Sequence, residues 1–293
     1  MPPALKSKAL VRVVAPSGPF EGPLLEAGLA RLSDYRVLAS AQLAERRQGF
    51  LAGSDEERRK ELQDALDCPR AAAIWVARGG YGLSRIAGGL SFEGFAENPK
   101  WIVGFSDATV LHLLAQKAGY ASLHAANGTT LARASDHEVQ QLICLLSGKT
   151  ELAFEGLTSL APGMCSGQLV GGNLTVLFAE AAAGRLRWPP GAVVLLEDVT
   201  ETSYRIDRML TALHLGGYLS AVAGVVLGDF HQCSAGKFDV PVADVLSEHA
   251  CRWQVPVVSG LPVGHGAHNR ALPLGALARL DARAGTLALS LNP

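Results

Sequence analysis

The chain has 293 residues, 48% hydrophobic and 18% charged, with a formal net charge of -1. That length suits two domains, and that composition is typical of a globular protein rather than a disordered one. The small charge gives no electrostatic reason to expect nucleic acid or an anionic membrane as a partner. No stretch approaches the roughly 18 consecutive apolar residues of a membrane-spanning helix, and the first residues lack a secretory apolar region.

The cysteines are odd in number, scattered and free of any C-x-x-C spacing. This usage is typical of thiols in a reducing compartment, and it favours neither a disulfide framework nor a zinc site. We therefore expect a cytoplasmic protein. The five are Cys68, Cys144, Cys165, Cys233 and Cys251.

In the first half of the chain, apolar runs of strand type alternate with segments of helical periodicity. The expected strands cover residues 10–15, 35–38, 73–77 and 101–103. Two helices begin at capping boxes, a serine followed three residues later by a glutamate, at Ser54–Glu57 and Ser135–Glu138. Such alternation predicts a parallel sheet covered by helices on both faces. We expect residues 1–148 to form an α/β domain of flavodoxin-like type.

Three loops directly follow expected strands of this sheet, at residues 16–19, 78–82 and 104–107. In open parallel sheets, ligands bind beyond the carboxyl ends of the strands. We therefore expect the three loops to converge on one site.

The third loop carries the first candidate catalytic residue. Trp101–Val103 is of strand type, and helical spacing begins at Thr109. A serine at a sharp strand-to-helix turn has the geometry of a nucleophile elbow, with N–H groups of the helix N-terminus below its hydroxyl. The motif is Gly-x-Ser-x-Ala rather than Gly-x-Ser-x-Gly. Ser106 is therefore either this nucleophile or a helix cap.

The glycine-rich loop 78–82 has two interpretations. The N–H of Gly80 could join the N–H of Asp107 in an oxyanion hole, because glycine lets the backbone approach a ligand closely. The alternative is a tight turn between strand and helix. Neither of the phosphate-loop patterns GxxxxGK[ST] and GxGxxG is present.

The second half of the chain has a different pattern. Residues 149–164 show little periodicity and several turn formers, so we expect them to connect two domains. Residues 165–293 predict a smaller α/β domain with a β-rich end. Apolar stripes mark helices within residues 206–213 and 242–249, and strands are expected at 192–196, 222–227, 256–259, 277–281 and 286–291.

A serine nucleophile needs a base, for which the chain offers eight histidines. His265 is the best placed, because it follows a short expected strand and lies between two glycines. His268 shares this loop, so a metal pair is the alternative, but no third ligand is apparent and we expect no metal. His124 and His231 follow expected strands, and they remain candidates for a role in the site. Packing or solvated positions are expected for His112, His137, His214 and His249.

The acid that orients the base is expected at Glu197 or Asp198, which close a buried strand. Carboxylates at such a position are costly unless paired, which favours a functional partner. Neighbouring strand residues point to opposite faces, so only one of the two can face the histidine. The residues alone do not choose between them.

Six stretches, in this order along the chain, resemble the LD-carboxypeptidase family of serine peptidases, also called muramoyltetrapeptide carboxypeptidases. Each alone is a weak motif, but together they span nearly the whole chain and are specific. They are VAPSGP at residues 14–19, ARGGYG at 77–82, GFSDAT at 104–109, GGNL at 171–174, LEDV with YRIDRML between 196 and 210, and GLPVGHGAHNRALPLG at 260–275.

The resemblance implies a catalytic set of Ser106, Glu197 and His265, with the N–H groups of Asp107 and Gly80 as the oxyanion hole. It implies hydrolysis of the amide between an L-centre and a terminal D-amino acid, which releases D-alanine from murein tetrapeptides during cytoplasmic peptidoglycan recycling. No cofactor is implied, and a homodimer is expected.

An exopeptidase must also bind the carboxylate of the departing residue, best done by arginine or backbone N–H groups. Arg78, Arg205 and Arg270 lie in or beside the expected loops, and each could instead be structural. Tyr81 and Asn173 are further candidates for the pocket, with packing and helix capping as their alternatives.

Two other functions stay open. A branch of the same family hydrolyses acyl-adenylate antibiotics such as processed microcin C and gives self-immunity. That branch needs an aromatic side chain to stack on adenine, for which the candidates are Trp188, Trp253 and Tyr204. A non-catalytic ligand-binding relative is the second alternative, against which the intact catalytic set argues.

Overall fold

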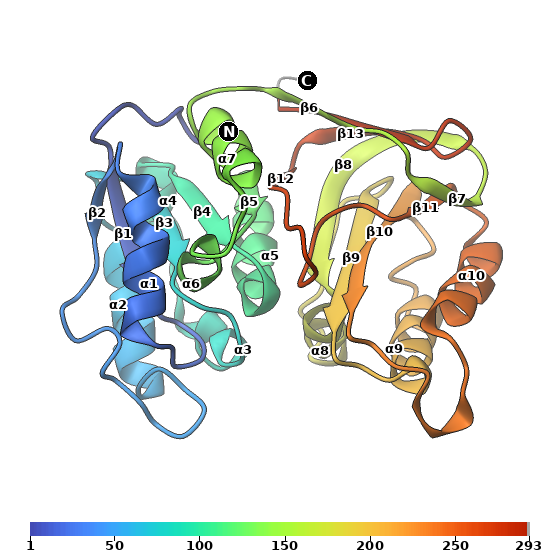
Figure 1. Cartoon of the computed structure of the whole chain (residues 1–293), viewed down its shortest axis with the longest axis horizontal. Helices are drawn as coiled ribbons and strands as arrows, with labels where there is room; N and C mark the ends of the chain where they lie inside the picture. The colour runs from blue at the N-terminus through green and yellow to red at the C-terminus, as the bar shows by residue number, and fades with distance from the viewer. Residues whose placement is uncertain (292–293) are drawn as a thin grey trace. The chain divides into compact units, whose positions relative to one another are not determined.

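The computed structural model describes residues 1–291, and its backbone contacts divide the chain into two compact units (Figure 1). Unit 1 comprises residues 1–149 and 270–272, and unit 2 comprises residues 150–269 and those from 273 onward. Within the described part of the chain, no helix is long and apolar enough to cross a membrane.

Unit 1 is built on a six-stranded sheet in the order β12-β5-β4-β3-β1-β2. Strands β1 to β5 pair in parallel, and their order in the sheet is the flavodoxin-like 2-1-3-4-5. The expected fold class is therefore confirmed. The strands are β1 (Leu10–Val14), β2 (Arg36–Leu38), β3 (Ala71–Val76), β4 (Trp101–Gly104), β5 (Ser122–His124) and β12 (Leu272–Leu274).

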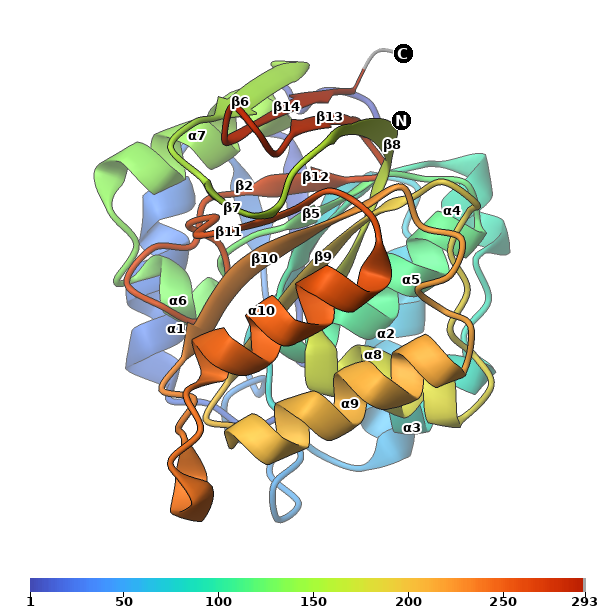
Figure 2. The same ribbon diagram turned by 90° about the vertical axis from the view of Figure 1, so that its right-hand side faces the viewer.

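Helices cover both faces of this sheet. Helix α1 packs on α6, while α2 packs on β1 and β3, and α5 packs on β4 and β5. Figure 2 shows α1 and α6 on one side of these strands and α2 and α5 on the other. The helices are α1 (Gly22–Leu29), α2 (Asp55–Leu66), α3 (Leu83–Ile86), α4 (Glu93–Glu97), α5 (Thr109–Lys117), α6 (Gly128–Leu131) and α7 (Asp136–Leu146).

Both predicted capping boxes are confirmed. The Glu57 N–H donates to Ser54 Oγ at 3.2 Å, and the Ser54 N–H donates to the Glu57 carboxylate at 2.8 Å. Ser135 and Glu138 make the same reciprocal pair at 3.3 and 2.7 Å. Each box satisfies N–H groups that a helix start leaves unpaired, which fixes where α2 and α7 begin.

Unit 2 contains an eight-stranded mixed sheet in the order β6-β14-β13-β8-β9-β10-β11-β7. Strands β8 to β11 pair in parallel, and the strands beyond them pair antiparallel. The strands are β6 (Glu151–Phe154), β7 (Thr158–Ala161), β8 (Met164–Asn173), β9 (Val193–Val199), β10 (Gly224–His231), β11 (Val257–Ser259), β13 (Leu277–Asp281) and β14 (Thr286–Ser290).

Three helices pack side by side in unit 2. Helix α8 (Leu174–Ala182) contacts β8, β9 and α9 (Ser203–Leu215), which in turn contacts α10 (Val242–Trp253). Figure 2 shows α9 and α10 in front of β9 and β10. The apolar stripes that predicted α9 and α10 are buried, which explains why these two helices were apparent in the sequence.

Residues 149–164, expected as a plain connection, contain β6 and β7, which both belong to the sheet of unit 2. In β6 the apolar Leu152 and Phe154 are buried, while their neighbours Glu151 and Ala153 are exposed. A strand of four residues with one buried face gives too short an alternation to stand out in a sequence.

Candidate active site

Ser106 lies in unit 1, where β4 turns into α5. Residues 106–108 form a turn of 3-10 helix, and the N-cap position of α5 is Ala108, so Ser106 does not cap that helix. The backbone of Ser106 has a φ of 67°, in the left-handed region that non-glycine residues seldom occupy. Such strain persists only where the surroundings impose it. Ser106 thus has the backbone of a nucleophile elbow.

Small residues let the neighbouring loop approach Ser106 closely. A Cβ built on Gly79 would lie 2.7 Å from Ser106 Cβ and 2.9 Å from its Oγ, so only glycine fits there. A Cβ on Gly104 would lie 2.9 Å from Asn127 Oδ1. The glycine-rich loop therefore packs directly on the serine, as the convergence of strand ends predicted.

Asn127 holds the residue before the serine, a role that the sequence reasoning missed. Its Oδ1 accepts the Phe105 N–H at 3.1 Å, and its Nδ2 donates to the Phe105 carbonyl at 3.4 Å. Asn127 is buried and precedes α6 without capping it by its side chain. An Asn-Gly pair ordinarily indicates a turn, so the sequence carried no separate signal for this contact.

His112 is buried, as the packing interpretation predicted, and it links the elbow to β5. Its Nε2 lies 2.9 Å from the Gly104 carbonyl and its Nδ1 lies 2.8 Å from Ser122 Oγ. A carbonyl can only accept, so Nε2 carries the proton and Nδ1 accepts from the serine hydroxyl. Burial lowers the pKa of His112 to about 4, although the bond to Gly104 acts in the opposite direction.

We expect His112 to make unit 1 less stable as the pH falls from about 6.5 to about 4. Over this range the unfolded chain binds a proton that the folded chain does not, so acid favours unfolding, by about 3 kcal/mol in total. Urea unfolding across this pH range, in the wild type and in His112→Gln, measures the effect. The free energy of unfolding should fall more steeply with decreasing pH in the wild type than in His112→Gln. An equal fall in both proteins would contradict a neutral buried His112.

The two other strand-end loops of unit 1 also touch each other. The Gly18 N–H donates to the Gly79 carbonyl at 3.1 Å. Gly80 has a φ of 110°, and a Cβ on it would lie 3.3 Å from Gly18 Cα. Both interpretations of the glycine loop are therefore compatible with its geometry, because it is a tight turn and also lies against the serine.

The three substrate-binding candidates of unit 1 differ in their surroundings. Arg78 is exposed and donates to the backbone of the neighbouring loop. Tyr81 is 49% exposed, and its ring lies 5.8 Å from the ring of Phe50. Arg270 Nε donates to Gln141 Oε1 at 3.4 Å, and burial lowers the pKa of its guanidinium. Arg78 and Tyr81 are thus open to a ligand beside the serine loops.

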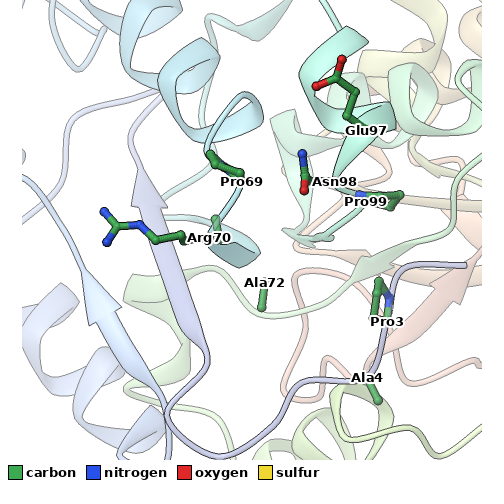
Figure 3. A pocket seen from close by; sticks show the side chains of 9 residues that line it. Pro3, Ala4, Pro69, Arg70, Ala72, Glu97, Asn98 and Pro99 are labelled. Atoms are coloured by element: carbon green, nitrogen blue, oxygen red, sulfur yellow. The ribbon is translucent and has the colours of Figure 1, made fainter.

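A hollow of about 560 Å³ adjoins these loops and is lined by Pro19, Arg78 and Thr129, among others. Another, of about 360 Å³, lies before β3 and β4, at the strand ends opposite to those that carry the serine loops. Figure 3 shows Arg70 and Glu97 at this second hollow, with their charged ends well apart. The position of the first hollow matches the usual binding edge of such a sheet.

In unit 2, the buried Glu197 and the half-buried His265 form a hydrogen-bonded pair. Glu197 lies on β9 and is fully buried, and its Oε2 lies 2.7 Å from Nδ1 of His265, in the loop after β11. The carboxylate can only accept, so Nδ1 carries the proton and Nε2 is the basic nitrogen of the neutral ring. This is the arrangement of a general base and the acid that orients it.

Opposing effects act on the imidazole of His265. Burial disfavours its charged form, whereas the hydrogen bond and charge of Glu197 favour it, with further support from Asp198 and Asp229. The net result is a pKa raised above the usual histidine value. His265 is therefore a stronger base than a solvated histidine.

Of the two adjacent carboxylates, Glu197 bonds to the histidine, whereas Asp198 bonds to residues at the start of α8. It accepts hydrogen bonds from the Thr175 N–H at 3.0 Å and from Asn173 Nδ2 at 3.1 Å. Burial raises the pKa of Asp198 to about 6. Asn173 in turn caps α8, because its Oδ1 accepts the Val176 N–H at 3.1 Å. The capping alternative for Asn173 is thus the one that the structure contains.

Glycines around His265 let its loop lie against carboxylates. A Cβ on Gly264, which has a φ of 128°, would lie 2.8 Å from Glu197 Oε2. A Cβ on Gly266 would lie 1.5 Å from Asp229 Oδ2. These two glycines let the backbone on either side of His265 pack closely against the carboxylates of Glu197 and Asp229.

The remaining candidates have structural surroundings. Arg205 pairs with Glu201 at 2.7 Å on the surface of α9. His124 is fully buried, with its ring 5.9 Å from that of Phe105, and His231 ends β10. Residues 1–291 contain no group of three or more His, Cys, Asp or Glu side chains that could hold a metal ion.

Comparison with known families covers both units. Residues 11–125 match the LD-carboxypeptidase N-terminal domain, and residues 166–280 match the LD-carboxypeptidase C-terminal domain. The chain belongs to the LD-carboxypeptidase family. The resemblance seen in the sequence motifs is thereby confirmed.

The proteins similar to this chain include murein tetrapeptide carboxypeptidases and a microcin self-immunity protein. The murein tetrapeptide carboxypeptidase of Pseudomonas aeruginosa is 32% identical, over 92% of this chain and 92% of its own length. A solved muramoyltetrapeptide carboxypeptidase of Oxalobacter formigenes is 28% identical, with a TM-score of 0.86 over 97% of this chain and 99% of the other. The microcin C7 self-immunity protein MccF of Escherichia coli is 24% identical, over 83% of this chain and 81% of its own length.

Proposed function

We propose that this LD-carboxypeptidase family member is a serine peptidase that removes the terminal D-alanine of murein tetrapeptides, in peptidoglycan recycling. The observation that carries the proposal is the hydrogen bond between the buried Glu197 and His265, with Oε2 and Nδ1 2.7 Å apart. It supplies a base of raised pKa with the basic nitrogen at Nε2. The relatives named for murein tetrapeptides support the substrate.

In the proposed reaction, Ser106 Oγ attacks the carbonyl carbon of the L,D-amide while His265 Nε2 takes the hydroxyl proton. Glu197 holds the Nδ1–H tautomer and stabilises the imidazolium. The proton then passes to the leaving nitrogen of D-alanine, and an acyl-serine ester remains. Water, deprotonated by the same imidazole, hydrolyses this ester and regenerates the serine.

The negative charge on the attacked oxygen needs donors that are already in place. We propose the N–H groups of Asp107 and Gly80 for this task. The strained backbone at Ser106 and the close packing of Gly79 on that serine support the proposal, because they set the two loops side by side.

We propose Arg78 as the group that binds the free carboxylate of the departing D-alanine. It is exposed, it belongs to the loop that packs on Ser106, and it lines the adjoining hollow. A guanidinium binds a carboxylate through two parallel hydrogen bonds, which suits an exopeptidase. Tyr81 and Arg270 are proposed as secondary contacts.

The aromatic candidates give the microcin-type alternative little support. Trp253 is buried in α10, and Trp188 is half-buried and donates to the Tyr218 carbonyl at 2.8 Å. Tyr204 is 44% exposed, but its ring packs at 6.4 Å from the ring of Phe238. Of the three, only Tyr204 offers much open surface for stacking on adenine.

The purified protein should release D-alanine from a murein tetrapeptide and not from the tetrapeptide that ends in L-alanine. Amino-acid analysis of tri-, tetra- and pentapeptide digests measures this specificity. An aminoacyl sulfamoyl adenosine serves as the competing substrate. Its hydrolysis, with the tetrapeptide left intact, would overturn the proposal in favour of the microcin-type activity.

We also propose a cytoplasmic homodimer. All five cysteines are free thiols, which is typical of proteins in a reducing compartment. Light scattering on the purified protein and fractionation of the producing cell test the two parts of this proposal separately.

A further inference from the structure

We propose that the side chain of Asp107 is a positioning residue that fixes the spacing of the two oxyanion-hole donors. The inference rests on the proposed function, in which the backbone N–H groups of Asp107 and Gly80 bind the oxyanion. It assigns a separate task to the carboxylate, which joins the three loops around the serine.

A single carboxylate oxygen makes both connections. Asp107 Oδ2 accepts the hydroxyl of Ser17 at 2.6 Å and the N–H of Leu83 at 2.9 Å. Asp107 is 2% exposed, and the other two residues are fully buried. Ser17 belongs to the loop after β1, and Leu83 begins α3 directly after the glycine-rich loop. The oxygen therefore connects the loops after β1 and β4 with the residue that directly follows the glycine-rich loop.

The position of Leu83 explains why this contact bears on Gly80. The N–H of the first residue of a helix has no partner within that helix, so the carboxylate supplies one. Gly80 lies three residues earlier, in a loop where Gly80 and Gly82 have φ values of 110° and 143°. A glycine-rich loop has many accessible conformations. The hydrogen bond from Leu83 to Asp107 fixes the end of this loop and so reduces that freedom.

The Ser17 contact extends the same connection to the loop after β1. Its carbonyl also accepts the Ala52 N–H at 2.9 Å, and the next residue, Gly18, bonds to Gly79. The backbone around Ser17 is thus fixed by hydrogen bonds to Ala52 and Gly79, so its hydroxyl has a defined position relative to the carboxylate. Burying a carboxylate is costly unless its lone pairs are hydrogen-bonded, and these two donors contribute to that requirement.

A side chain at position 107 that is uncharged, or too short to reach Ser17 and Leu83, should therefore leave the spacing of the two N–H donors less fixed. The nucleophile, the base and both N–H donors remain present. The expected defect belongs to the transition state, where the oxyanion forms, and not to binding of the ground state. A merely structural role would lower stability and leave the turnover of the folded enzyme unchanged.

The test compares Asp107→Ala, Asp107→Asn and Ser17→Ala with the control Ser135→Ala, which removes the cap of α7 away from the serine loops. Three quantities are measured on each protein: kcat and KM for the murein tetrapeptide, the second-order rate of Ser106 labelling by a fluorophosphonate, and the melting temperature. The labelling reaction also places negative charge in the oxyanion hole, and it does not depend on the identity of the peptide.

For Asp107→Ala we expect kcat and the labelling rate to fall together, by about 100-fold to 1000-fold, with KM within about threefold of the wild type. Asp107→Asn, which keeps an oxygen acceptor, should recover at least about tenfold of this loss. Ser17→Ala should cost about threefold to tenfold, and nothing more when Asp107 is already alanine. Ser135→Ala should lower the melting temperature alone.

The proposal is overturned if Asp107→Ala keeps kcat and the labelling rate within twofold of the wild type, or if it raises KM alone. If Asp107→Ala does not fold, a wild-type labelling rate in both Asp107→Asn and Ser17→Ala overturns it equally. Failure of the wild type to cleave any L,D-peptide would instead refute the proposed function, while the labelling rates would still decide the role of Asp107.

Discussion

Replacing Ser106 by alanine is expected to abolish D-alanine release, with kcat reduced by a factor on the order of 10⁴ to 10⁶. The same change should end all labelling of the protein by a fluorophosphonate. Loss of the hydroxyl removes the atom that forms the acyl-enzyme, and no neighbouring group in the described loops supplies a second one in the same strained position.

A second substitution separates loss of chemistry from loss of folding. Ser106 has a φ of 67°, which glycine adopts without strain. Ser106→Gly should therefore be inactive and also more stable, by about 1 kcal/mol or more in urea unfolding. Ser91→Ala, which changes a serine at the start of α4, should keep wild-type activity. Turnover by Ser106→Ala at more than a hundredth of the wild-type rate would remove Ser106 from the mechanism.

The change Glu197→Gln is expected to lower kcat by about 10⁴-fold while leaving the fold intact. The amide has nearly the same shape, but its NH₂ group can donate to the imidazole and so favour the wrong tautomer. The wild-type carboxylate raises the pKa of His265, so the active neutral ring is lost as the pH falls below that raised value. In the variant the acidic limb of the kcat–pH profile should therefore shift to lower pH.

Asp198→Asn is the matched control, because it makes the same chemical change one residue further along β9. Asp198 bonds to the start of α8 rather than to the histidine, so we expect a loss of less than tenfold in kcat. We expect Asp198→Asn to lower the stability of the fold more than its turnover. The amide has one acceptor oxygen, so its NH₂ group must face either the two donors of Thr175 or the donors of Asn173 and Val199. A greater loss of turnover in Asp198→Asn than in Glu197→Gln would reverse the assignment of the acid.

The sequence carried much of the fold because strong local signals agreed with the tertiary structure. Both capping boxes and the apolar stripes of α9 and α10 lie where they were expected. The short strands β6, β7 and β12 and the ten-residue strand β8 (Met164–Asn173) were not predicted, whereas the strand expected before His124 is β5. Runs of three or four residues have no measurable periodicity, and their pairing depends on partners far away in the chain.

The candidate site was predictable where a motif fixes the backbone. The strand–serine–helix pattern predicted the turn at Ser106, and adjacent strand residues predicted that only one of Glu197 and Asp198 faces the histidine. Which of the two does so depends on the twist and register of β9, which no local pattern encodes. Asn127 and the carboxylate of Asp107 were missed because their partners lie on other loops.

The proposed activity depends on one physical event, the transfer of a proton from the hydroxyl of Ser106 to the imidazole of His265. The rate at which a fluorophosphonate labels Ser106 in His265→Ala, compared with the wild type at the same pH, tests that transfer most directly. The account predicts labelling at least about 1000-fold slower in a variant that circular dichroism shows to be folded. Labelling of His265→Ala at the wild-type rate would contradict it.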